Sequence, residues 1–104
     1  MSQNQDEKKI YYLFNGRSVR VPVGAVLELD ISVNPFNDEE IKLSYDKDAF
    51  DVENRTRIRA DEDEQTEYYD FTARKEGRFV IEGGIKFADG TSYTDSYIID
   101  VVKE

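Results

Sequence analysis

The stretch FVIEGGIKFADGTSYTDSYIIDVV, residues 79–102, has the pattern of two long strands joined by a tight turn. Asp89–Gly90 stands between two runs rich in β-branched and aromatic residues, and it supplies a backbone that tolerates the positive φ of a hairpin turn. The first strand has one apolar face, which carries Phe79, Ile81, Ile85 and Phe87. The pair Gly83–Gly84 within it predicts a β-bulge or a close approach of a neighbouring backbone.

The same two-residue period recurs along the rest of the chain. Residues 25–33 place Leu27, Leu29, Ile31 and Val33 on one face, and residues 40–45 do so with Ile41, Leu43 and Tyr45. Further strands are predicted at 10–14, 18–21, 55–60, 67–73 and 92–102. No segment has a sustained helical period, so only a second sheet can cover these apolar faces. We therefore predict an all-β fold, an immunoglobulin-like antiparallel β-sandwich of about 7–8 strands in two sheets.

Length and composition limit the domain organisation. A chain of 104 residues is the size of one domain. Residues 1–9 contain no apolar residue except Met1, so they are predicted to form a flexible N-terminal tail, and residues 10–104 to form the single domain. The chain shows neither a signal peptide nor a membrane span, and we favour an extracytoplasmic or cell-surface location as one module of a larger protein.

Charge and residue usage exclude several classes of function. The chain has 23 acidic and 14 basic residues, a formal charge of −9, which repels phosphate backbones and anionic lipid. Neither nucleic acid nor membrane insertion is expected. The chain contains no His and no Cys, so the usual general base and the best nucleophile are both missing. We expect a protein that is not an enzyme.

Three acidic segments, residues 37–40, 46–51 and 60–64, raise the question of a metal. Calcium takes six to eight oxygen ligands, which carboxylates on neighbouring loops can supply. None of the segments has the spacing of a helix-loop-helix calcium site, and acidic loops are usually solvated. No cofactor is expected, with calcium binding left as the alternative.

Six residues are candidate contacts for a protein partner: Asn34, Pro35, Phe36, Arg55, Arg57 and Arg59. Pro35 cannot donate to a strand ladder, so Asn34–Pro35 is predicted to end a core strand and begin a loop. Phe36 then either folds back as a plug or points outward as a contact. The three arginines alternate along one strand and share a face. They are expected to pair with acidic residues of a neighbouring strand, and the alternative is that they bind an acidic partner.

Two resemblances extend these interpretations. Residues 67–102 resemble the closing strands of bacterial and archaeal immunoglobulin-like modules, with an alternating strand, a Gly-containing turn and a Val-rich last strand. More of the chain resembles chagasin-type inhibitors of papain-like cysteine peptidases, which are also immunoglobulin-like. The segments that follow the order of that family are NGRSVRVPVGAVLELDISVNP (15–35), AFDVENR (49–55), YDFTARKEGRFVI (69–81) and YIIDVV (97–102).

The second resemblance implies a binding mode. In that family an Asn-Pro-Thr-Thr-Gly loop, a Gly-rich loop and an Arg-Pro-Trp loop line up at one end and fill the peptidase cleft. Asn34 and Pro35 match the first loop, while Phe36, Asn37 and Asp38 differ from it. RADEDEQ at 59–65 and KFADG at 86–90 stand where the other two loops would be.

Two functions follow as hypotheses. The first is a non-catalytic immunoglobulin-like module for protein interaction, spacing or assembly. The alternative is a chagasin-type inhibitor of cysteine peptidases that acts through loops 34–40, 59–65 and 86–91. Both imply a protein partner, and the residues leave the identity of that partner and the oligomeric state open.

Overall fold

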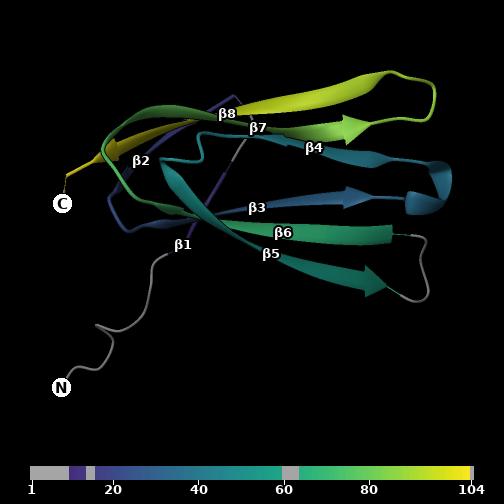
Figure 1. The fold of residues 1–104 in the computed structure, drawn as a ribbon, viewed down its shortest axis with the longest axis horizontal. Helices are drawn as coiled ribbons and strands as arrows, with labels where there is room; N and C mark the ends of the chain where they lie inside the picture. The colour runs from purple at the N-terminus through teal and green to yellow at the C-terminus, as the bar shows by residue number, and fades with distance from the viewer. Residues whose placement is uncertain (1–9, 14–15, 60–63, 104) are drawn as a thin grey trace.

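A computed structural model describes residues 10–13, 16–59 and 64–103, and the predicted tail at 1–9 lies outside this part. The described residues form two four-stranded sheets that pack face to face (Figure 1). The first sheet has the order β1 (Ile10–Tyr12), β3 (Val26–Val33), β6 (Glu64–Ala73) and β5 (Phe50–Arg59). The second has the order β2 (Ser18–Pro22), β8 (Ser92–Val102), β7 (Gly77–Lys86) and β4 (Glu40–Ser44). The predicted all-β sandwich is confirmed.

Side chains from the facing sides of the two sheets make one core. Its largest fully buried members are Phe71, Leu27, Ile81, Ile99 and Val21. Phe71 packs edge to face against Tyr45 and Phe50, with ring centroids 5.3 Å and 6.0 Å away. The apolar faces predicted for β3, β4 and β7 therefore meet in the interior, where they shield each other from water.

Two pairings differ from the expected antiparallel arrangement. β1 pairs with β3 in parallel, and β2 pairs with β8 in parallel. The two short strands belong to different sheets, so the chain changes sheets between them. Alternation shows which side of a strand faces the core but not the direction of its neighbour, and for this reason the sequence did not reveal the mixed sheets.

The strands β5 and β6 are longer than predicted. β5 begins at Phe50 rather than at residue 55, and β6 begins at Glu64 rather than at residue 67. One antiparallel ladder joins them from Phe50 opposite Ala73 to Arg59 opposite Glu64. The added residues are mostly polar or acidic, because β5 lies at the edge of its sheet, and this weakens the apolar alternation on which the prediction depended.

Gly83 and Gly84 mark a close backbone approach, and the alternative of a bulge is wrong. The register between β7 and β8 runs from Gly77 to Lys86 without an extra residue. A Cβ atom on Gly84 would overlap the carbonyl oxygen of Tyr93 on β8. A Cβ atom on Gly83 would lie 3.0 Å from Cδ2 of Leu29 in the facing sheet. The two glycines thus allow close packing in two different directions.

Candidate functional site

One end of the sandwich carries the described connections 34–39 and 87–91 together with the end of β5 and the start of β6, and we call it the loop end. Val33 at the end of β3 lies opposite Gln65, and Arg59 at the end of β5 lies opposite Glu64. In the other sheet Lys86, the last residue of β7, lies opposite both Glu40 and Ser92. The described connections 34–39 and 87–91 therefore leave from the same end, on the right in Figure 1, where β5 also ends and β6 begins. Residues 60–63, which make up most of the predicted loop 59–65, lie outside the described part of the chain.

The connection 34–39 is held by its own hydrogen bonds. Oδ1 of Asn34 accepts from the backbone N–H of Phe36 at 3.0 Å, and its carbonyl oxygen accepts from that of Asn37 at 3.1 Å. The backbone N–H of Asn34 donates to Oε1 of Glu39 at 2.8 Å. These bonds fold residues Pro35–Asn37 into a short 3-10 turn, η2, and Asp38 follows with a φ of 57°. The predicted end of a core strand at Asn34–Pro35 is confirmed.

The structure shows which of the two predicted orientations the side chain of Phe36 adopts. Its side chain is 79% exposed, so it points outward and does not fold back as a plug. An aromatic side chain exposed to this degree contributes little to folding and is free to be buried by a partner. The bonded backbone around it fixes where the ring is presented.

The connection 87–91 is a tight turn of similar rigidity. The backbone N–H of Phe87 donates to the carbonyl of Thr91 at 2.8 Å, and Gly90 donates to Phe87 at 3.0 Å. Oδ1 of Asp89 accepts from the backbone N–H and from the hydroxyl of Thr91, at 2.9 Å and 2.6 Å. These bonds lower the pKa of Asp89. Gly90 has a φ of 91°, as the predicted hairpin requires.

The loop end is acidic. Its described carboxylates are Asp38, Glu39, Glu40, Glu64 and Asp89. Lys86 is the basic residue at the adjoining end of β7. Such an end attracts a partner surface of positive potential.

A buried carboxylate lies behind the loop end, on the inward face of β6. Glu67 is only 8% exposed. Its Oε1 accepts from Nδ2 of Asn54 at 3.0 Å and from Oγ1 of Thr56 at 2.8 Å, and its Oε2 accepts from Nε2 of Gln65 at 2.6 Å. Burial raises the pKa of Glu67, but these three donors lower it by more, and the net pKa lies below the ordinary value.

Sequence reasoning missed this cluster, although a signal was present. Glu67 stands in the same alternating positions as Tyr69, Phe71 and Ala73, which pack in or against the core. A charged residue at an inward position calls for hydrogen-bond donors on the neighbouring strand. Asn54 and Thr56 on β5 supply them.

The three arginines are spread along β5, and Arg55 does not lie at the loop end with Phe36. Arg55 lies on the outer face of the first sheet, where its Nη2 is 3.2 Å from Oε1 of Glu28 and 3.3 Å from Oδ2 of Asp70. Its guanidinium also lies over the ring of Tyr68, 5.2 Å from the centroid. The expected cross-strand pairing is thus present for Arg55, and it raises the pKa of this group. Arg57 is exposed and forms no ion pair with the described residues, and Arg59 ends β5 at the loop end.

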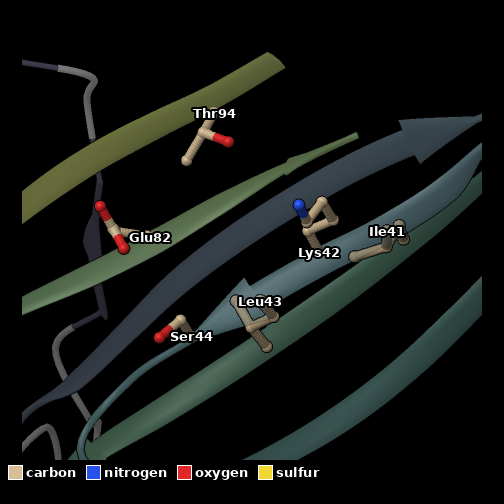
Figure 2. A pocket seen from close by; sticks show the side chains of 6 residues that line it. All are labelled: Ile41, Lys42, Leu43, Ser44, Glu82 and Thr94. Atoms are coloured by element: carbon tan, nitrogen blue, oxygen red, sulfur yellow. The ribbon is translucent and has the colours of Figure 1, made fainter. Parts of the chain in front are cut away.

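The described residues also form hollows outside the loop connections. A hollow of about 430 Å³ runs along β4. Figure 2 shows that Lys42 and Ser44 of β4 line it together with Glu82 of β7 and Thr94 of β8. Gly84 lies between Lys42 and Thr94 in the register and leaves room there. A smaller hollow of about 180 Å³ is lined by residues of β3, β7 and β8, among them Tyr97, whose pKa burial raises to about 12.

The acidic segments are divided between the two ends of the sandwich. Residues 37–40 lie at the loop end, and residues 46–51 lie at the opposite end, where β5 begins. Most of the segment 60–64 is outside the described residues. Within the described part of the chain, no three Asp or Glu side chains are grouped so as to hold a metal ion. No helix there is long and apolar enough to cross a membrane.

Comparisons with known proteins relate this fold to solved structures, three of which are described below. No protein-family model and no curated protein matches the chain. The crystal structure of the cysteine protease inhibitor EhICP2 from Entamoeba histolytica matches with a TM-score of 0.74 and 15% identity, over 89% of this chain and 95% of that one. The solution structure of Amebosin matches with a TM-score of 0.60 and 13% identity, over 88% and 98% of the two chains. PbICP-C, solved in complex with falcipain-2, matches with a TM-score of 0.57 and 12% identity, over 100% and 96%.

Proposed function

We propose that this chain is a non-catalytic inhibitor of papain-like cysteine peptidases, with an immunoglobulin-like framework of the chagasin type. It acts by placing its loop end in the peptidase cleft. One observation carries the proposal: the chain shares its fold with a cysteine protease inhibitor over 95% of that protein, and it presents an ordered loop with an exposed aromatic at the loop end. The complex of PbICP-C with falcipain-2 further supports a protein as the partner.

The geometry suits binding without chemistry. A loop that is already bonded in one conformation loses little entropy when it is bound. Phe36 adds apolar surface that would be removed from water only in the complex. Aromatic anchors at the centre of an interface carry a large share of the binding energy. The exposed ring and the ordered turn therefore act together.

Phe36 is one of three residues that depart from the first loop of the family, and it has a specific role in this proposal. Asn34 and Pro35 match the Asn-Pro of the chagasin-type first loop, and Phe36 stands where that loop has a small residue. We assign Phe36 to an apolar pocket of the cleft. This inhibitor reading replaces the spacer or assembly module as the favoured function, because the matched structures include a protease inhibitor and none of the three is described as a bacterial or archaeal module.

The test is inhibition of papain by the purified chain, compared with the variants Phe36→Ala and Tyr12→Ala. Phe36→Ala is expected to raise the inhibition constant at least about tenfold, since an aromatic anchor is lost. Tyr12 is also an exposed aromatic, but it lies on β1 outside the loop end, and its replacement should leave inhibition within about threefold of the parent.

Two results would count against the proposal. Absence of inhibition of papain and of other papain-like peptidases at micromolar concentrations would remove the inhibitor function. Equal effects of the two substitutions would show that the loop end is not the binding surface. Because Phe36 makes little contact with the folded domain, a change in inhibition by Phe36→Ala does not reflect unfolding.

A further inference from the structure

The strand β5 forms a long free edge of the first sheet. It has ten residues, Phe50–Arg59, and it is the outermost strand, paired with β6 on one side only. The backbone groups on its other side are not paired within the described residues. Free edges of this length invite the addition of another strand, and proteins usually restrict such pairing by charge.

The charges of β5 are complementary to those of a second β5 in antiparallel orientation. When the strand is paired with a copy of itself so that Arg55 lies opposite Arg55, Glu53 of each copy lies opposite Arg57 of the other. This makes two cross-strand pairs of opposite charge on the outer face. The same register places residue 51, an Asp, opposite residue 59, an Arg.

The inward face is complementary as well. Ile58 is 70% exposed, an unusual state for an isoleucine in a strand. In the register centred on Arg55 it lies opposite Val52 of the second copy, whose side chain is half-buried. The contact would remove apolar surface from water in both copies.

Glu53 and Arg57 are available for these pairs. Both are exposed, and neither forms an ion pair with another residue that the structure describes. Arg55, which faces its own copy at the centre, already has carboxylates of Glu28 and Asp70 within 3.3 Å. Each central guanidinium is therefore neutralised inside its own subunit, which weakens the repulsion between the two.

We propose that the chain forms a homodimer through antiparallel pairing of the two β5 strands, centred on Arg55. The first sheets of the two copies then join into one continuous sheet of the order β1-β3-β6-β5-β5-β6-β3-β1. Because the two β5 strands run in opposite directions, the two loop ends point away from each other and remain open. The dimer is independent of the proposed peptidase inhibition, and each can fail without the other.

Sedimentation velocity over a concentration series up to the millimolar range tests the proposal. An ionic strength of about 0.15 M is suitable, since it screens charges beyond about 8 Å and so reduces the mutual repulsion of two acidic subunits. The parent chain should show a monomer that converts to a dimer as concentration rises. E53R and R57E should each weaken the dimer at least about tenfold, because two pairs of like charge replace two of opposite charge.

The double variant E53R/R57E exchanges the two charges and should restore dimerisation to within about threefold of the parent. Glu76→Arg and Lys103→Glu are the matched controls, since they change net charge by the same amounts at exposed positions away from β5 and should leave the dimer unchanged. Thermal melts of every variant check folding. Amide hydrogen exchange should show protection of β5 that grows with concentration.

Several outcomes would overturn the proposal. A chain that stays monomeric over the whole series has no such dimer. A dimer that the single variants do not weaken, or whose protected amides lie on another edge, uses a different surface. A double variant that fails to recover excludes this register. In a register centred on Asn54, for example, Glu53 lies opposite Arg55 and residue 51 lies opposite Arg57. The charge exchange would then disturb both pairs and would not restore the dimer.

Discussion

At the scale of single residues, Glu67 shows how a buried charge is tolerated in this small core. It lies on β6, which pairs with β3 and β5, and its carboxylate receives hydrogen bonds from Asn54, Thr56 and Gln65. A buried carboxylate without such donors is strongly destabilising, whereas hydrogen bonds to a charged group each contribute about 1.5–3 kcal/mol. The cluster joins β5 to β6 close to the loop end.

The pKa of Glu67 implies a defined dependence of stability on pH. Its pKa in the folded chain is lowered, so the ionised form stabilises the fold at pH values above the unfolded pKa of about 4.5. This contribution is lost as the pH falls from that value through the lower, folded pKa. Glu67→Gln is therefore expected to reduce the free energy of unfolding at pH 7 by about 1–3 kcal/mol and to flatten the loss of stability at acid pH.

Urea denaturation at a series of pH values measures both effects. Glu40→Gln is the control, since Glu40 is an exposed strand residue with the same change in charge. If both variants lose stability equally and show the same pH dependence as the parent, the buried cluster does not hold the charge that the structure assigns to it.

At the scale of elements, β7 depends on two adjacent glycines with different functions. Gly84 lets the backbone of β7 approach that of β8, because any Cβ at this position would meet main-chain atoms of Tyr93 and Thr94. Gly83 faces the other sheet, where a Cβ would meet the flexible ends of Leu29 and Ile31. Backbone cannot move aside without breaking the strand pairing, but a side-chain end can shift.

We therefore expect Gly84→Ala to be far more damaging than Gly83→Ala. Gly84→Ala should reduce the free energy of unfolding by about 3 kcal/mol or more, while Gly83→Ala should cost about 1–2 kcal/mol. Thermal melts followed by circular dichroism compare the two. The matched pair excludes a general effect of adding a methyl group to β7, and similar losses in the two variants would contradict the close approach at Gly84.

At the scale of the whole molecule, the chain has a formal charge of −9, and its described acidic residues are not concentrated at one end of the sandwich. The two described acidic segments lie at opposite ends, and no group of metal-ligating side chains forms among the residues that the structure places. Several of these carboxylates instead order the backbone of their own turns, as Glu39, Asp46 and Asp89 do. We propose that the domain needs no metal to fold or to bind.

Because the domain is proposed to need no metal, we expect calcium and chelator to leave its melting temperature unchanged within about 1 °C. A calcium site filled at about 100 times its Kd would add about 2.7 kcal/mol to the free energy of unfolding, and would raise the melting temperature of a domain this size by roughly 10 °C or more. Differential scanning calorimetry with calcium, with magnesium and with chelator makes the measurement. A rise specific to calcium would reinstate the acidic loops as a site.

Much of the fold was readable from local pattern. The alternation in β3, β4 and β7 predicted the inward faces, and Asp89–Gly90 predicted the turn before β8. The site was only partly readable. Asn34–Pro35 predicted the end of a strand, but whether Phe36 pointed inward or outward depended on how the whole loop was bonded. The pairing of Arg55 with Glu28 and Asp70 was predicted as a type of contact, but the partners could not be named.

The sequence by itself determined which residues alternate, where the turns occur, that His and Cys are missing and how much charge the chain carries. Alternation and turns can be predicted locally, since side-chain direction and backbone preference are set within a few positions of the chain. Residue content and charge follow directly from the sequence. Only the tertiary structure decided the parallel pairings of β1 and β2, the donors around Glu67, the close approach at Gly84 and the meeting of the connections at one end. Each of these joins residues far apart in the chain, and the register between strands that brings them together is set by packing of the two sheets as a whole.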